Sequence, residues 1–318
     1  MKKVSLFLAA GILTITALTS CTKPSNKNFI LATGGTSGTY YPFGGAIASI
    51  WNENINGMNV TAQATGASAE NLRLISKGDA EFAIVQNDVM DYAYNGSDMF
   101  TTKLENISTI GTLYPEVVQI AASKNSDIKS VADLKGKRVS IGDAGSGVEF
   151  NAKQILEGYG LTFDDIQKNN LSFKESAEGI QNGTLDACFV TAGVPNAALQ
   201  ELAFTKGLIL IPVDGAEADA ICATHSFYTK TVIPAGTYNG TDTDTPAMAI
   251  KATLAVNSKL DEDTVYEMTK TLFSNLDKLG AAHAKGKEVS AESAVTGVSV
   301  PFHPGAAKYF EEIGLSVK

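Results

Sequence analysis

The spacing of apolar residues changes from strand-like to helix-like across a glycine-rich turn near the start of the chain. Residues 29–32 are a short apolar run, and they are followed by the Gly- and Thr-rich segment 33–38. Apolar side chains then return at the i, i+4, i+7 and i+8 spacing of one helix face, at Phe43, Ile47, Ile50 and Trp51. This pattern predicts a strand, a tight turn and a helix.

The same order occurs a second time, at residues 137–156. A strand is predicted at 138–141 and a turn at 142–147, and the helix face that follows carries Val148, Ala152, Ile155 and Leu156. The first N–H groups of a helix have no internal partner, and small residues in the preceding turn let a ligand oxygen approach them. Each turn therefore predicts an anion site built mainly from backbone. A tight turn without a ligand is the alternative, and the second copy favours binding.

Another unit is also repeated. Residues 69–77 form a predicted helix with Ser68 as N-cap and Gly78 as its stop, and a buried strand at 79–85 ends in Gln86, Asn87 and Asp88. In the second copy, a helix at 176–182 and Gly183 precede a strand at 186–190, which ends in Thr191, Ala192 and Gly193. Strands that alternate with helices imply mostly parallel sheets, whose ligands bind beyond the carboxyl ends of the strands.

The connections between these halves predict two lobes joined by a hinge. A strand at 117–122 leaves the first half, 130–134 is a one-turn helix, and a loop at 233–245 precedes a returning strand at 249–256. Helices at 263–279 and 305–313 complete the chain. We therefore expect an α/β protein with lobe 1 at 29–117 plus 248–318 and lobe 2 at 118–247, each a mostly parallel sheet flanked by helices. A hinge over a cleft is a device for enclosing a small molecule.

The first 20 residues predict a secretory signal, with Lys2 and Lys3 before an apolar stretch. Its end resembles a bacterial lipobox, which makes Cys21 the candidate lipidated residue and 21–28 its tether. An ordinary signal followed by a structural cysteine is the alternative. Removal of the signal takes the formal charge from −9 to −11, because two lysines are lost. No later stretch is long and apolar enough to cross a bilayer.

The acidic balance argues against nucleic acid, since tracking phosphates requires clustered basic charge and the chain has only two arginines, Arg73 and Arg138. Cys188 and Cys222 lie in apolar runs and are expected to be small buried hydrophobes, although export leaves a disulfide between them open. Three scattered histidines make a zinc site improbable. We expect no metal and no cofactor.

The candidate binding residues are those on the turns, helix starts and strand ends that face the predicted cleft. They are Thr36, Ser37, Gly38, Tyr40, Tyr41, Ser68, Asn71, Gln86, Asn87, Asp88, Tyr114, Gly145, Ser146, Gly147, Glu149, Thr191 and Gly193. The three tyrosines offer flat apolar walls with polar tips. With no paired arginines placed to clamp it, a ligand carboxylate is expected to rest chiefly on backbone N–H groups and hydroxyls.

An enzymatic function is not expected. Neither Ser37 nor Ser146 lies between glycines at −2 and +2 as in a nucleophile elbow, and neither has an evident His partner. No phosphate loop or dinucleotide fingerprint is present. Asp88 and Glu149 could form an acid/base pair across the cleft, but carboxylates beside a binding turn more often orient a ligand or a neighbouring side chain.

Several motifs resemble signatures of the TAXI family, the solute-binding subunits of tripartite ATP-independent periplasmic (TRAP) transporters. They lie at 34–42, 65–74, 85–89, 142–147, 233–238 and 303–306. The resemblance implies a Venus-flytrap, periplasmic-binding-protein receptor. Such a receptor is held outside the cytoplasm in the bacterial envelope, here through lipid on Cys21, and delivers glutamate or a related small organic acid to a permease, often fused, driven by an ion gradient.

Two points stay open beside this resemblance. Asp143, Ala144 and Val148 depart from residues frequent in the family, which leaves the ligand undetermined. A lipid-anchored sensor that reports its ligand to a membrane signalling protein would use the same fold and the same closure. Neighbouring permease genes would favour the transport function.

Overall fold

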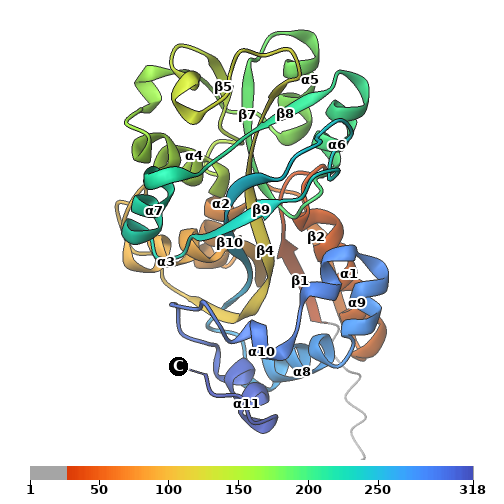
Figure 1. Cartoon of the computed structure of the whole chain (residues 1–318). Helices are drawn as coiled ribbons and strands as arrows, with labels where there is room; N and C mark the ends of the chain where they lie inside the picture. Colours follow the sequence, from red (N-terminus) through yellow and green to blue (C-terminus); the bar gives the residue numbers. More distant parts are fainter. Residues whose placement is uncertain (1–26, 318) are drawn as a thin grey trace, which may run out of the picture.

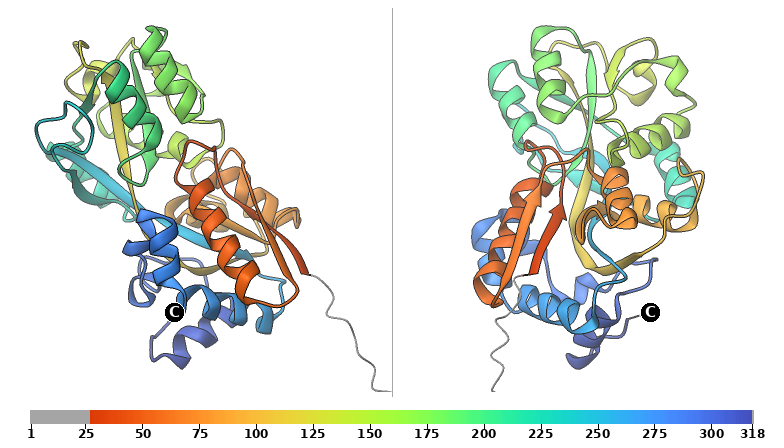
Figure 2. Two further views of the ribbon diagram at one scale, coloured as in Figure 1. Left: turned by 90° about the vertical axis from the view of Figure 1, so that its right-hand side faces the viewer. Right: turned by 180° about the vertical axis from the view of Figure 1, so that it is seen from behind.

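The structure is a computed structural model that describes residues 27–317, so the predicted signal, Cys21 and most of the tether lie outside the described residues. Two lobes lie end to end and are joined by two long strands, β4 (Ile107–Ser123) and β10 (Thr245–Asn257) (Figures 1 and 2). The domain boundaries predicted at 117/118 and 247/248 fall inside these two strands and stay a prediction.

The first lobe contains both ends of the described chain. Its other strands are β1 (Lys27–Ala32), β2 (Met58–Gln63) and β3 (Phe82–Gln86). Its helices are α1 (Tyr40–Asn54), α2 (Ser68–Lys77), α3 (Asn87–Asn95), α8 (Glu262–Phe273), α9 (Leu276–Ala282), the 3₁₀ helix η3 (Ala284–Glu288), α10 (Ala291–Ala294) and α11 (Pro304–Glu312).

The second lobe is built from the middle of the chain. Its strands are β5 (Arg138–Ser140), β6 (Gln167–Asn169), β7 (Ala187–Ala192), β8 (Leu208–Ile211) and β9 (Thr229–Ile233). Its helices are α4 (Gly147–Gly158), α5 (Phe173–Asn182), α6 (Ala197–Thr205) and α7 (Gly215–Thr224), with 3₁₀ turns η1 (Val131–Leu134) and η2 (Phe163–Asp165).

Sheet pairing explains how the lobes are connected. The strand order is β2-β1-β3-β10-β4-β7-β5-β6, while β8 pairs with β4 and β9 pairs with β10. Strand β1 runs parallel to β2 and β3, and β5 runs parallel to β6 and β7. The crossing strands β4 and β10 pair antiparallel with their neighbours. Each lobe thus has a parallel part whose carboxyl ends face the other lobe.

Each predicted helix face packs into the core of its own lobe. In α1, Phe43, Ile47 and Trp51 are fully buried, and the Trp51 indole N–H donates to the Met268 carbonyl at 2.8 Å. In α4, Ala152 and Ile155 are fully buried in the core of the second lobe. Truncation of Trp51 to Ala should cost about 3–5 kcal/mol, because it leaves a large cavity.

Several predicted elements differ in extent from the observed ones. The strand expected at 117–122 is the second half of the 17-residue β4, because buried polar side chains such as Thr112 break its apolar pattern while bonding to backbone carbonyls. The helix expected at 263–279 is two helices, α8 and α9, separated at Ser274 and Asn275. The segment after β3, expected to be only a polar strand end, continues as α3.

Two local predictions also need correction. Ala67, with φ +71°, is the N-cap of α2, and Ser68 lies in the first turn, where its hydroxyl accepts from the Gln86 N–H at 3.1 Å. Cys188 and Cys222 are both free, and only Cys188 is buried. Burial raises the pKa of the Cys188 thiol to about 12.

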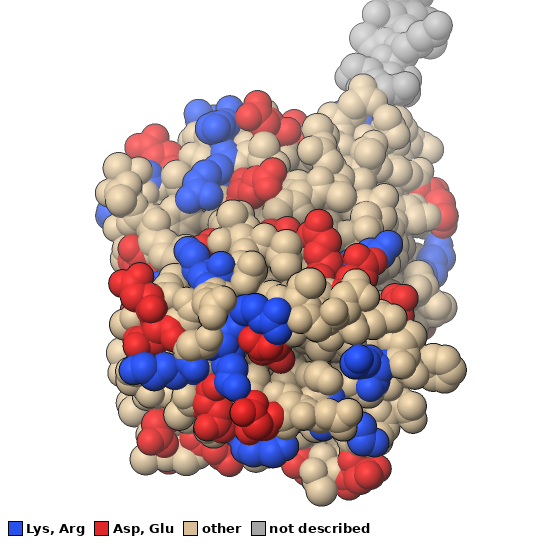
Figure 3. Space-filling model, turned by 90° about the horizontal axis from the view of Figure 1, so that it is seen from above, with Lys and Arg blue, Asp and Glu red and all other residues tan. Residues whose placement is uncertain are grey.

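Across residues 27–317, no helix combines the length and apolar content needed to span a bilayer. The face seen from above carries basic and acidic side chains interspersed, without a large field of one sign (Figure 3). That mixture is unlike the basic stripe that follows a nucleic-acid backbone.

Candidate functional site

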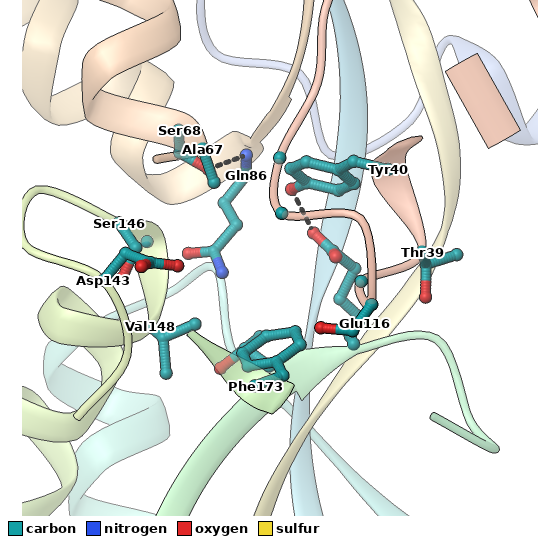
Figure 4. Close-up of a pocket in the computed structure, with 17 residues that line it drawn as sticks. Thr39, Tyr40, Ala67, Ser68, Gln86, Glu116, Asp143, Ser146, Val148 and Phe173 are labelled. Carbon is teal, nitrogen blue, oxygen red and sulfur yellow. Dashed lines mark hydrogen bonds between the residues drawn. The ribbon is translucent and has the colours of Figure 1, made fainter. Parts of the chain in front are cut away.

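A small cavity of about 40 Å³ lies between the lobes, at the carboxyl ends of the parallel strands (Figure 4). Turns, helix starts and strand ends from both lobes line it: Gly34, Gly35, Ser37, Gly38, Thr39, Tyr40, Ala67, Ser68, Gln86, Glu116, Asp143, Ser146, Gly147, Val148, Phe173, Thr191 and Ala192. Such a crevice is where ligands of open α/β sheets bind.

Four helices begin at this cavity. Thr39 is the N-cap of α1, Ala67 that of α2, Gln86 that of α3 and Ser146 that of α4. Neither Thr39 nor Ala67 caps its helix through a side chain, so the first N–H groups of α1 and α2 are not satisfied in that way. Helix starts carry partial positive charge and favour anions, and no Lys or Arg is among the described residues that line the cavity.

A buried carboxyl group faces these helix starts. Glu116 on β4 is only 1% exposed, and its Oε2 accepts a hydrogen bond from the Tyr40 hydroxyl at 2.5 Å. Burial raises the pKa of Glu116 to about 8, against the opposing effect of the Tyr40 hydrogen bond. Burial likewise holds the pKa of Tyr40 well above its usual value. Burial therefore favours the neutral forms of both groups in this site.

Two further polar atoms in the wall are buried without a partner among the described residues, Gln86 Oε1 and Thr191 Oγ1. Figure 4 shows the Gln86 side chain reaching into the cavity, with Asp143 on one side and Tyr40 and Glu116 on the other. Burial raises the pKa of Asp143 as well, with smaller contributions from Glu175 and Glu70. Phe173 closes the wall of the second lobe beside Gly38.

The lobes also bond directly to each other around the cavity. The Gly193 N–H donates to Thr39 Oγ1 at 3.1 Å, and Asn196 Nδ2 donates to the Ser37 carbonyl at 3.3 Å. On another side, the Ala69 N–H donates to the Gly145 carbonyl at 3.2 Å. These contacts describe a closed arrangement.

About half of the predicted binding residues line the cavity. They are Ser37, Gly38, Tyr40, Ser68, Gln86, Ser146, Gly147 and Thr191. Gly193 lies just outside and takes part in the contact between lobes. The two glycine-rich turns thus meet at one cavity, although they are more than a hundred residues apart in sequence.

Other predicted residues are not in the wall, because they are exposed or engaged elsewhere. Thr36 and Tyr41 are exposed. Asn71 Nδ2 donates to the Thr33 and Ile84 carbonyls at 2.6 and 2.9 Å, and Asn87 bonds to the backbone of Gly297 and Lys251.

The remaining four also have structural contacts. Tyr114 packs edge-on against Phe43, with ring centroids 4.9 Å apart. Glu149 Oε2 accepts from the Gly145 N–H at 2.8 Å, so that this pair shapes the second turn. Asp88 accepts from Asn151 of the other lobe at 3.0 Å. Asp88 and Glu149 therefore do not form an acid/base pair at the cavity.

The sequence prediction missed nine residues of the wall: Gly34, Gly35, Thr39, Ala67, Glu116, Asp143, Val148, Phe173 and Ala192. Most are direct neighbours of predicted residues, so wider turn boundaries would have included them. Glu116 had its own signal, a lone carboxylate just before an apolar strand. Phe173 had none, because it reaches the cavity from the start of α5.

None of the three histidines lines the cavity. Within residues 27–317, no group of three or more His, Cys, Asp or Glu side chains is placed to hold a metal ion. The arrangement can bind a small polar molecule that carries an anionic group.

A model of the NMT1-like family matches residues 31–314. The chain belongs to the NMT1-like family. One curated relative, the putative aliphatic sulfonates-binding protein of Escherichia coli (strain K12), is 32% identical over 114 residues, which are 36% of this chain and 33% of that protein. The match thus spans about a third of the relative's length.

Solved structures show that this NMT1-like protein has the two-lobed periplasmic-binding-protein fold, which confirms the predicted fold class. One is the alkanesulfonate-binding protein of Xanthomonas axonopodis pv. citri bound to MOPS, with 13% identity, coverage of 91% and 85% of the two chains and a TM-score of 0.50. Another is a putative L-cystine ABC transporter protein of Listeria monocytogenes, with 14% identity, coverage of 84% and 98% and a TM-score of 0.52.

The family match corrects the resemblance drawn from the motifs. The chain is an NMT1-like protein whose curated relative is named for aliphatic sulfonates, and the TAXI assignment was wrong. The motifs led to the wrong family because most of them are turns and helix starts. Any binding protein that exposes helix N-termini to a ligand uses such residues, so they are poor markers of one transporter class.

Proposed function

We propose that this protein is an extracytoplasmic solute-binding receptor that captures a small organic anion between its lobes and delivers it to the membrane subunits of a transporter. The observation that carries this proposal is the convergence of four helix starts from both lobes on one small cavity. The family and the names of its relatives support the same function.

The anion is proposed to be a carboxylate or a sulfonate. Hydrogen bonds to a charged group contribute about 1.5–3 kcal/mol each, and a partly buried helix start adds up to about 2 kcal/mol. A few such contacts are enough for micromolar affinity, about 8 kcal/mol. The small cavity favours short ligands, and the name of the curated relative makes alkanesulfonates the first candidates beside short carboxylates.

Calorimetry with a panel of short alkanesulfonates, dicarboxylates and amino acids tests the proposal. At least one class should bind with micromolar affinity, and scattering should show a more compact protein with ligand than without. If no anion in the panel binds, the receptor function is wrong. Uncharged analogues such as short alcohols and amides serve as controls and should not bind.

A further inference from the structure

A loop of the second lobe contacts the first glycine-rich turn of the first lobe. The loop consists of residues 193–196, between β7 and α6, and two of its groups donate hydrogen bonds to the turn. The Gly193 N–H donates to Thr39 Oγ1 at 3.1 Å, and Asn196 Nδ2 donates to the Ser37 carbonyl at 3.3 Å. Ser37 and Thr39 line the cavity, whereas Gly193 and Asn196 do not. The loop therefore acts on the wall of the cavity from outside it.

Asn196 is held in the second lobe by its other polar groups. As the N-cap of α6, its Oδ1 accepts from the N–H groups of Ala198 and Leu199 at 3.0 and 3.3 Å. Its own N–H donates to the Tyr238 hydroxyl at 2.9 Å, and that hydroxyl donates to Gln119 Oε1 on β4. The residue is 2% exposed. Because two N–H donors fix the position of the amide oxygen, the amide nitrogen must be the end that faces the first lobe.

The peptide group between Ser37 and Gly38 is bonded through both of its polar atoms. Its carbonyl accepts from Asn196, and its N–H, which belongs to Gly38, donates to the Gly35 carbonyl at 2.9 Å. A planar peptide group with both polar atoms bonded cannot rotate freely, and its orientation sets the course of the chain that follows. That chain enters α1 at Tyr40, so the bond from Asn196 restrains the turn directly before the helix start.

We infer that Asn196 is a positioning residue, which fixes the first glycine-rich turn in the closed arrangement so that the N–H groups at the start of α1 are aimed at a ligand anion. This inference rests on the proposed function, because it requires that those N–H groups hold the ligand. It gives the Asn196 side chain two separate roles. The amide oxygen caps α6, and the amide nitrogen holds the Ser37 carbonyl of the other lobe.

Asn196→Asp separates these two roles. Asp is as good an N-cap as Asn, so α6 keeps its cap. A carboxylate cannot donate, and its second oxygen would face the Ser37 carbonyl as acceptor against acceptor. In calorimetry, the variant should bind the tightest anion of the panel about tenfold more weakly than wild type, or worse, while its denaturant midpoint stays close to that of wild type. An unchanged affinity would overturn the inference.

Two further variants separate the loss of the donor from the added negative charge. Asn196→Ser keeps a capping hydroxyl and adds no charge, but its side chain is too short to serve Ser37 as well, so affinity should fall about threefold to tenfold. Asn182→Asp adds the same charge at an exposed position of the same lobe and should bind like wild type. If Asn182→Asp weakened binding as much as Asn196→Asp, or if Asn196→Ser bound like wild type, charge would explain the effect and the inference would be wrong.

Hydrogen exchange and binding rates provide readouts that a role in α6 alone would not change. Because the contact joins the two lobes, its loss should appear mainly as faster ligand dissociation in stopped-flow measurements. Peptides that cover residues 35–43 should gain less protection on ligand binding in Asn196→Asp than in wild type, while α6 stays equally protected in both. Equal protection of residues 35–43 in the two proteins would contradict the inference.

The same experiments distinguish failure of this inference from failure of the proposed function. If the wild-type protein binds anions and Asn196→Asp binds them equally well, the receptor function stands and the role of Asn196 is wrong. If the wild-type protein binds no anion of the panel, both are wrong.

Discussion

Asn151 Nδ2 on α4 donates a hydrogen bond to Asp88 Oδ2 on α3 at 3.0 Å, and both residues are fully buried between the lobes. Asn151 also donates to the Tyr228 hydroxyl at 2.8 Å, and Tyr228 in turn donates to Gln154 Oε1 at 2.9 Å. This network lies outside the cavity. Its bond between Asn151 and Asp88 joins the two lobes in the closed arrangement described here.

Asn151→Ala should therefore weaken ligand binding without touching the ligand. The closed state then holds Asp88 Oδ2 buried without its donor, which costs about 1–3 kcal/mol, and the apparent dissociation constant rises with the fraction of open protein. We expect affinity to fall about tenfold or more for every ligand alike, and scattering to show a more open ligand-free protein. Asn182→Ala, at an exposed position in the same lobe, is the control. Loss of affinity for some ligands only would instead place Asn151 in ligand recognition.

Stability should depend on pH through two buried acids. Burial raises the pKa of Asp88 to about 7 and that of Glu116 to about 8. Unfolded Asp and Glu titrate near pH 4, so the folded state binds more protons between these limits, and its stability is lost as pH rises through the folded values. Burial lowers the pKa values of His225, His283 and His303, so these residues make stability rise with pH. Their effect ends near pH 6.5, the ordinary pKa of an unfolded histidine.

The fall in stability should therefore be clearest between about pH 6.5 and 8, where the histidines no longer oppose it. The melting temperature of the ligand-free protein should fall across this range, and Asp88→Asn should make the fall shallower because the contribution of Asp88 is removed. Differential scanning calorimetry at several pH values measures both. A wild-type melting temperature that rises across this window would show that the two carboxyls are ionised in the folded protein.

The local parts of the site could be predicted from sequence, and the long-range parts could not. Gly38 and Gly147 lie in clusters of small and polar residues that predict a turn, so both turns of the cavity were predicted. Asp88 was predicted to lie at a strand end, but it is the second residue of α3 and bonds to Asn151 of the other lobe. No local pattern contains that partner, because Asn151 is 63 residues away.

Glu116 also shows that long-range contacts could not be predicted, because it lines the cavity and was not among the predicted residues. Its position in the wall depends on β4 crossing between the lobes and pairing with β7, which no segment of sequence displays. The fold class was accessible because alternating strands and helices imply it directly. The transporter class was not, since turn motifs report backbone geometry and not the membrane partner.

The lipid anchor remains a prediction that concerns residues outside those described. If Cys21 carries lipid, Cys21→Ala should move the protein from the membrane fraction to the soluble envelope fraction, because stable anchoring takes two or more acyl chains. Fractionation followed by mass spectrometry of the mature N-terminus measures this. An unmodified Cys21 in a wholly soluble wild-type protein contradicts the prediction.

Arg138 should have no part in ligand binding. It pairs with Asp186, with Nη2 to Oδ1 at 2.6 Å, at a partly exposed site that does not line the cavity. Arg138→Ala should leave ligand affinity unchanged and lower the stability only slightly, because exposed ion pairs contribute little. Denaturant unfolding and calorimetry measure the two effects. A large loss of affinity would mean that a salt bridge holds the ligand and that the backbone description of the site is wrong.

Gly147 should be the position least tolerant of a side chain. A Cβ placed there would lie 2.1 Å from Gln86 Oε1 of the other lobe, so Gly147→Val would push the lobes apart and cover the start of α4. Ligand binding should be abolished, whereas Gly45→Val, where a Cβ meets nothing within 4 Å, should leave it unchanged.

Ser146→Ala completes this comparison at the same helix start. The Ser146 hydroxyl accepts from the Glu149 N–H at 3.3 Å, so the variant loses a cap worth about 1 kcal/mol of stability but keeps the backbone donors. Its ligand affinity should fall only modestly, by about tenfold or less, in calorimetry with the tightest ligand of the panel. If Ser146→Ala abolished binding while Gly147→Val was tolerated, side-chain hydroxyls and not backbone N–H groups would hold the anion.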